Sequence, residues 1–211
     1  MTPLTGRNRQ PECPLSSADL ARLATPLDFI AEDHWREREI CAALERLAAT
    51  DQEDKRNRTS AGDLPVSASS APGYPDPEDI AQSLTFLTRE LPLHLADEEE
   101  DLFPLMRRCC APEDEIGRVI ERLLLDHSHA AKDTPKVIAI LEDLQSRPPT
   151  EQERQVLAQF ASHARRHLIL ENAVVLPIAR LRLRSCDHES LRLCMMQRRG
   201  IPLPEVDPGT E

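Results

Sequence analysis

The sequence predicts an all-α protein: an up-down four-helix bundle with a long flexible loop between its first two helices and a short helix near the C-terminus. Apolar residues recur at steps of three and four along four long segments, and no segment shows sustained alternation of period two. Stretches rich in proline and polar residues separate the segments. With 211 residues and 40% hydrophobic content, the chain can build one core.

The composition divides the chain into a bundle and two tails. Residues 1–22 contain three prolines and little periodicity, which is typical of an extended tail. The bundle takes residues 23–184, interrupted by a flexible insert over 51–77 that is too polar to order itself. Residues 185–211 are predicted to form a short amphipathic helix, over 189–199, and a second tail.

The first two helices begin with the same signal, a capping side chain followed by proline. Thr25 caps a first helix over about 26–49, and Asp76 caps a second over about 77–109. Proline suits the first helical position because the N–H group that it lacks would have no helical partner there. Within the second helix, Pro92 predicts a kink.

The third and fourth helices are separated by a proline-rich turn. An acidic start at 112–115 opens the third helix, whose apolar stripe continues to Leu144. The turn covers residues 146–150, and the fourth helix follows over about 151–183. Helices of this length can hold a site in the core of a bundle.

One pattern occurs in both the second and the fourth helix. His94-Leu-x-x-Glu98 and His167-Leu-x-x-Glu171 are each followed by a proline six residues past the glutamate. Residues four apart lie on one helix face, so each repeat presents an imidazole and a carboxylate in one direction. That direction is the apolar, core-facing side of the helix.

Each repeat has a further histidine upstream, in the dipeptides Asp33-His34 and Asp126-His127. Buried carboxylates require protons, cationic partners or a metal ion, and four histidines beside them favour a metal. The alternative is a set of core histidines bonded to neighbouring carboxylates without an ion. The predicted metal ligands are His34, His94, Glu98, His127, His167 and Glu171.

These residues resemble the hemerythrin-like (HHE) family of di-iron bundle proteins, over about residues 23–184 without the insert. The resemblance implies two iron ions, joined by an oxo or hydroxo bridge. It implies that Glu98 and Glu171 bridge the ions, with His34 and His94 on one and His127 and His167 on the other. From the residues alone, imidazole and carboxylate suit iron, manganese or zinc. Two imidazoles per ion leave open positions, which favours a reactive or ligand-binding centre over a closed structural one.

One departure bears on the function. Oxygen-carrying hemerythrins have a further histidine one turn after the ligand on the third helix, and Ala131 stands at that position here. The chain therefore resembles members associated with nitric oxide, oxidative stress and iron–sulfur cluster repair. We expect a di-iron protein that binds oxygen, nitric oxide or peroxide. The alternatives are a nitric oxide reductase or iron donor, which needs a reductant or iron–sulfur protein partner, and a structural metalloprotein.

Several other polar residues compete for roles at the site. His163, one turn before His167, is a candidate for an additional ligand or for a hydrogen-bond donor to a ligand. Asp101 is an outside candidate, and His129 is expected to point away from the cluster. Glu99 and Glu100 lack the four-residue spacing and are expected on the solvated face.

Charge and cysteine content limit the compartment and the partners. A net charge of −11 argues against nucleic acid, and the arginine-rich stretches 180–184 and 198–199 are interpreted as solvated helix ends. No apolar run is long enough for a membrane span, and the polar start lacks a signal-peptide core. Six cysteines without a C-x-x-C pair suit the reducing cytoplasm, and Cys41 is expected to fill space in the core.

Overall fold

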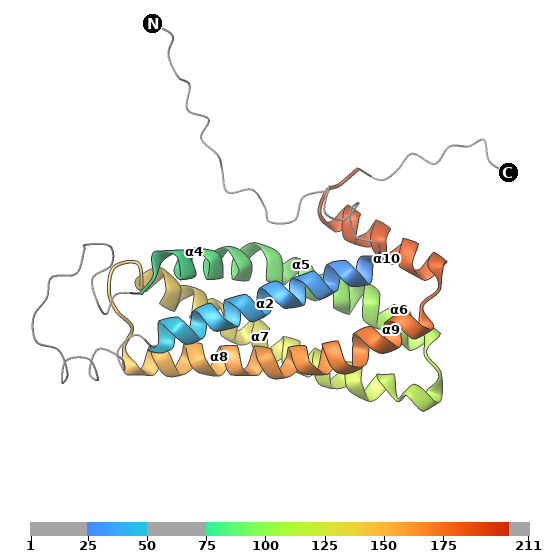
Figure 1. The fold of residues 1–211 in the computed structure, drawn as a ribbon, viewed down its shortest axis with the longest axis horizontal. Helices are drawn as coiled ribbons and strands as arrows, with labels where there is room; N and C mark the ends of the chain where they lie inside the picture. The colour runs from blue at the N-terminus through green and yellow to red at the C-terminus, as the bar shows by residue number, and fades with distance from the viewer. Residues whose placement is uncertain (1–24, 50–74, 203–211) are drawn as a thin grey trace, which may run out of the picture.

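The structure, a computed structural model, describes residues 25–49 and 75–202. Every regular element of these residues is helical. Four long helices form the bundle, and consecutive helices run in opposite directions (Figure 1). The first is α2 (Pro26–Ala49) and the third is α7 (Ile116–Asp143). The predicted all-α bundle is confirmed.

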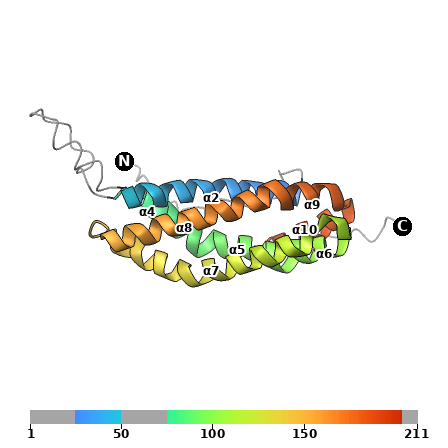
Figure 2. The ribbon, with the colours of Figure 1, turned by 90° about the horizontal axis from the view of Figure 1, so that it is seen from below.

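The second and fourth bundle helices are each a continuous series of α and π segments. The second consists of α4 (Pro77–Thr85), η1 (Phe86–Glu90), α5 (Leu91–Ala96), η2 (Asp97–Leu102) and α6 (Phe103–Cys109). The fourth consists of α8 (Glu151–Leu170), η4 (Glu171–Val175) and α9 (Leu176–Arg182). A 3-10 turn, η3 (Pro112–Asp114), precedes α7, and α10 (Ser185–Arg198) follows the bundle. Helix α2 packs against α4 and α8, and α7 closes the other side (Figures 1 and 2).

The capping residues act as the sequence predicts. Thr25 Oγ1 accepts a hydrogen bond from the N–H of Asp28 at 3.3 Å, and Asp76 Oδ1 accepts one from Glu78 at 2.9 Å. These side chains satisfy N–H groups that have no partner within the first helical turn. The predicted tail 1–22 and most of the predicted insert 51–77 lie outside the described residues.

The second residue after each π segment is a proline: Pro92, Pro104 or Pro177. In all three cases the N–H group just before the proline bonds the carbonyl five residues back. Proline has no N–H and its ring crowds the carbonyl four residues back, so an extra residue in the turn relieves the clash. The kink expected at Pro92 thus takes the form of the π segment η1. The prolines of the sequence repeat set the π segments that contain Glu98 and Glu171.

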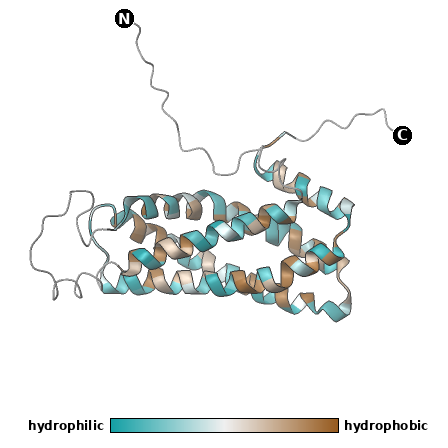
Figure 3. Cartoon of the chain, in the orientation of Figure 1, coloured by the Kyte–Doolittle hydropathy of each residue, from teal (hydrophilic) through white to brown (hydrophobic). Residues whose placement is uncertain are grey.

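The apolar core is split into two clusters, one toward each end of the bundle. The first includes Leu27, Phe103 and Ile120, and the second includes Leu44 and Leu141. On every bundle helix the predicted metal ligands fall between the stretches that feed these clusters. Hydrophobic and hydrophilic residues are interleaved along each helix, as expected for amphipathic helices (Figure 3). In the described part of the chain, no helix has the length and apolar character needed to cross a membrane.

Cys41 is buried in the second apolar cluster, as expected for a small core residue. Burial raises the pKa of its thiol to about 12, so the thiol stays protonated at neutral pH. The side chain therefore acts as an apolar filler.

The C-terminal helix α10 begins four residues before the predicted start at 189, because Asp187 caps it by accepting a hydrogen bond from the N–H of Arg184 at 3.0 Å. The other arginine-rich stretch, 180–184, is partly exposed and ion-paired. Arg182, for example, donates to Asp114 at 2.8 Å.

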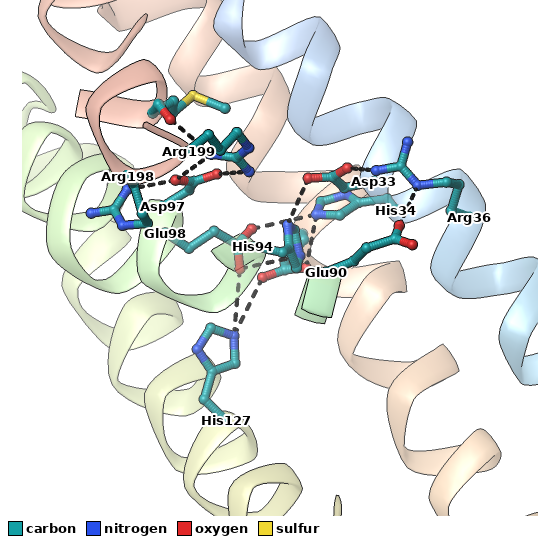
Figure 4. Close-up of polar contacts among 12 residues, drawn as sticks. Asp33, His34, Arg36, Glu90, His94, Asp97, Glu98, His127, Arg198 and Arg199 are labelled. Atoms are coloured by element: carbon teal, nitrogen blue, oxygen red, sulfur yellow. Dashed lines mark hydrogen bonds and ion pairs between the residues drawn. The ribbon is translucent and has the colours of Figure 1, made fainter. Parts of the chain in front are cut away.

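The interpretation of residues 198–199 as a solvated helix end is wrong. The side chains of Arg198 and Arg199 are only 17% and 10% exposed, because they contact the acidic segment η2. Arg199 donates to Asp97 at 2.6 Å, and Arg198 donates to Asp101 at 2.7 Å and Glu100 at 2.9 Å. Figure 4 shows both arginines around Asp97, one residue before Glu98. These ion pairs hold α10 against η2, the segment that contains the predicted metal ligand Glu98.

Candidate metal centre

All six predicted ligands converge between the two apolar clusters. They form two groups of four, and within each group one ligand atom from every residue lies within 4.8 Å of the others. Glu98 and Glu171 belong to both groups. We call His34 and His94 the first half of the centre, and His127 and His167 the second half. Figure 4 shows His34, His94 and His127 directed toward the carboxylate of Glu98.

In the first half, both imidazoles turn Nε2 toward the shared carboxylates. His34 Nε2 lies 3.4 Å from Glu98 Oε1 and 3.2 Å from Glu171 Oε2. His94 Nε2 lies 3.6 Å from Glu98 Oε2, the other oxygen of the same carboxylate. The two rings are nearly perpendicular, with centroids 5.1 Å apart. The first half therefore offers two imidazole nitrogens and oxygens from both shared carboxylates around one point.

The second half repeats this arrangement. His167 Nε2 lies 3.0 Å from Glu171 Oε1, and His127 Nε2 lies 3.5 Å from Glu98 Oε2. The Nε2 atoms of His127 and His167 are 3.1 Å apart. Two neutral imidazoles with the same nitrogen converging on one point suit a cation between them, because both nitrogens can then donate a lone pair.

The buried polar atoms of the cluster support a metal. Several have no hydrogen-bond partner: His94 Nε2, Glu98 Oε2 and both carboxylate oxygens of Glu171. Buried polar atoms without partners are costly, and a cluster closed by hydrogen bonds would not leave so many. The donor set fits borderline divalent metals such as iron, manganese or zinc. The residues present therefore fit a pair of metal ions that share two carboxylates.

The chain matches the hemerythrin HHE cation binding domain over residues 25–179. It belongs to the hemerythrin HHE family. No curated protein matches the chain. The match covers all four bundle helices and the six converging ligands, so cation binding by this HHE bundle is the property that the family and the cluster share.

Without a metal, protons balance the charge of the HHE cluster. Burial by itself lowers the pKa of His34, but Glu98 and Glu171 outweigh burial and raise it to about 9. The same balance raises the pKa of His127 to about 9. Burial alone would raise the pKa of Glu171, but the imidazoles of His127 and His167 bring it well below its ordinary value. Metal ions would take the place of these protons, because a ligand must be deprotonated to bind.

A carboxylate outside the cluster faces the free ring nitrogen of three of the four imidazoles. Asp33 Oδ2 lies 3.6 Å from His94 Nδ1, and Asp126 Oδ2 lies 4.0 Å from His167 Nδ1. Glu99 Oε1 lies 2.8 Å from His127 Nδ1. The hydrogen bond between His127 and Glu99 is of the kind that fixes the tautomer and the orientation of a metal-binding imidazole. The two aspartates are too far away to form a hydrogen bond and contribute negative charge beside His94 and His167. Both aspartates belong to the Asp-His dipeptides of the sequence. Each lies beside a histidine on another helix, and not beside the histidine that follows it in the chain.

Glu99 corrects a prediction, because its side chain does not project away from the cluster. It is 41% exposed and still contacts His127. Glu98 and Glu99 both lie in the π segment η2, whose wider turn lets adjacent side chains reach the same side of the helix. Glu100 is exposed as expected and pairs with Arg198. Asp101 also pairs with Arg198 and belongs to neither group of ligands.

The remaining histidines lie to one side of the second half. His163 is not in either group of four; its Nε2 lies 3.7 Å from Asp126 Oδ1, so it reaches the centre through Asp126. His129 is exposed and outside both groups, as expected. Its ring and that of His163 have centroids 6.0 Å apart.

Glu37, which lies one turn after His34, is not among the predicted site residues. The residue is buried, and burial raises the pKa of its carboxyl to about 7. It lines a small cavity of about 20 Å³ beside His127 and His167. The spacing of three residues from His34 is the only sequence signal that could have indicated it.

Proposed function

We propose that this HHE bundle holds two iron ions between His34, His94, Glu98, His127, His167 and Glu171, and that it binds one small molecule beside them. The observation that carries this proposal is the sharing of Glu98 and Glu171 between two groups of four ligands. Glu171 turns Oε2 toward His34 and Oε1 toward His167, and Glu98 Oε2 lies near both His94 and His127, so each carboxylate would be in reach of both ions. Bound iron would supply open coordination positions and redox chemistry.

The cavity next to the second half supports a small ligand. His127, His167 and Glu37 line it together with apolar side chains, among them Leu91 and Phe160. A volume of about 20 Å³ holds little more than one water-sized molecule. Oxygen, nitric oxide or peroxide therefore suits the space, and a larger organic substrate does not. We also propose a cytoplasmic location.

Ala130 and Ala131 provide a matched test of this cavity. Ala130 lines the cavity, whereas Ala131 is exposed. Ala130→Leu should fill the space, and overpacking of this kind costs about 1–3 kcal/mol. We expect the iron content to stay at two per chain while the affinity for nitric oxide, measured anaerobically by absorption titration, falls at least about tenfold. Ala131→Leu should leave both unchanged.

Three outcomes would contradict the proposal. One zinc ion and no iron per chain after growth in iron-replete medium would indicate a structural metalloprotein. Equal nitric oxide binding by the two leucine variants would place the ligand elsewhere. Rapid turnover of nitric oxide with an added reductant would instead make the protein an enzyme, with a need for a reductant or an iron–sulfur protein as partner.

A further inference from the structure

A third cluster of metal-binding side chains lies outside the centre, between α7 and α8. Asp126, His129 and His163 each place one ligand atom within 4.8 Å of the others. Asp126 and His129 are three residues apart on α7, and His163 comes from the facing helix α8. Two imidazoles and one carboxylate are a ligand set that suits zinc, ferrous iron or another borderline divalent ion.

The floor of this cluster contains buried atoms without partners. Asp126 is 6% exposed, and its Oδ1 accepts no hydrogen bond, although Arg122 Nε lies 3.3 Å from it in an ion pair. His163 Nε2, 3.7 Å from that oxygen, is also buried without a hydrogen-bond partner. Both atoms have lone pairs available to a cation, and burying them without a hydrogen bond costs free energy.

The cluster is accessible from solvent. His129 and His163 line an open pocket of about 550 Å³, so a bound ion could keep water molecules at its remaining positions. His163 also lines the small cavity beside His127 and His167. The cluster thus lies between the surface pocket and the proposed ligand cavity.

The charges nearby are mixed. Arg122 Nε donates to Asp126 Oδ2 at 3.3 Å, but its side chain is 63% exposed and can turn into solvent when a cation binds. Asp133, Lys136 and Arg166 line the outer pocket. Of these, Arg166 is engaged with Ser162 Oγ at 2.7 Å. The net charge of −11 favours accumulation of cations around the whole protein.

We propose that Asp126, His129 and His163 form a third, solvent-facing site for a divalent transition-metal ion. The site is distinct from the pair of ions in the core, and it is linked to the second half by one side chain. Asp126 turns Oδ1 toward His163 and Oδ2 toward His167 Nδ1, at 3.7 Å and 4.0 Å. An ion held by Oδ1 therefore shares its carboxylate with a ligand of the core.

Cobalt titration tests the site, because Co²⁺ bound by imidazole has visible absorption bands. The full-length protein, freed of loose metal by gel filtration, is titrated with Co²⁺ in phosphate-free buffer. The wild type should bind one more Co²⁺ per chain than His129→Gln or His163→Gln, or bind it at least about tenfold more tightly. His188→Gln, a histidine on α10, is the control and should behave as the wild type.

The same titration in the Glu98→Gln background separates this inference from the proposed function. Loss of the core pair should leave the third ion in place, because Glu98 is not among its ligands. Thermal melting of each variant shows that it is folded. Equal Co²⁺ binding by the wild type, His129→Gln and His163→Gln, all folded, would overturn the third site, whatever the core contains.

Discussion

The two halves of the centre have matching ligands but different surroundings. In the first half, Asp33 faces His94 and is itself held by Arg36, which also donates to Glu90 at 3.0 Å. Figure 4 shows Arg36 between Asp33 and Glu90. The side chains of Arg36 and Glu90 are only 20% and 12% exposed, so they screen this half from solvent.

The second half is more open. Its aspartate, Asp126, contacts an arginine that is 63% exposed, and a cavity and a surface pocket lie beside it. The sequence repeat therefore fixes the ligands, and residues outside the repeat determine access. We expect the first half to hold its ion firmly and the second half to exchange metal and bind ligands.

The largest expected effect comes from the residues that both halves share. If Glu98 bridges the two proposed ions, Glu98→Gln removes an anionic oxygen from both, so metal analysis should find both lost or greatly reduced, and Glu171→Gln should behave alike. His34→Ala and His127→Ala should each weaken one ion. Glu100→Gln, a change to an exposed side chain, is the control and should retain two ions. Retention of both ions by Glu98→Gln would rule out a bridge.

The difference in closure predicts unequal roles for two arginines. Arg36→Gln leaves the buried carboxylate of Asp33 and the partly buried carboxylate of Glu90 without their partner, which should lower the free energy of unfolding by about 2 kcal/mol. Arg122→Gln removes an arginine that is 63% exposed, so solvent already screens its ion pair with the buried Asp126, and the change should cost less, no more than about 1 kcal/mol. Urea denaturation of the metal-free variants measures both. Equal losses would mean that the halves are equally closed.

Protonation should affect the metal-free halves in the same direction. The pKa values of His34 and His127 are raised to about 9 from 6.5 in the folded protein, so their contribution to stability is complete below pH 6.5 and is lost as the pH rises through 9. The metal-free protein should therefore melt at a lower temperature at pH 9 than at pH 6.5, by about 4 °C or more.

Metal should abolish this dependence, because bound ligands carry no titrating proton. His127→Gln should remove part of the fall in melting temperature and leave the part that belongs to His34. A metal-free protein whose melting temperature stayed constant or rose over this range would contradict the charge balance described for the cluster.

The smallest effect should come from Glu99, which has no counterpart in the first half. The equivalent residue of the repeat is Asn172, which donates to the carbonyl of Leu168 at 2.7 Å, and His34 Nδ1 has no hydrogen-bond partner. Glu99→Gln should weaken the ion of the second half by about tenfold and leave the ion of the first half unchanged. Competition with a chelator measures both affinities. An equal loss of affinity for both ions would show that Glu99 does not act on the second half alone.

The sequence by itself determined the bundle and the convergence of the six ligands. Helical periodicity and the spacing of four residues are local properties, so His94 with Glu98, and His167 with Glu171, had to share the apolar face of their helices. The capping signals likewise depend on neighbouring residues alone. The repeated proline after each glutamate was visible too, although its effect, a π segment around Glu98 and Glu171, was not predicted.

Only the tertiary structure decided what surrounds the ligands. Asp33 lies beside His94, and Glu99 contacts His127, because different helices meet there. Sequence periodicity does not show which side chains face each other across a bundle. Ala130 lines the cavity, and Ala131, where oxygen-carrying hemerythrins have a further histidine, does not. Which of the two residues faces the cavity also depends on how the helices pack together. Arg199 is paired with Asp97 because α10 folds back over η2, a contact between residues about a hundred positions apart.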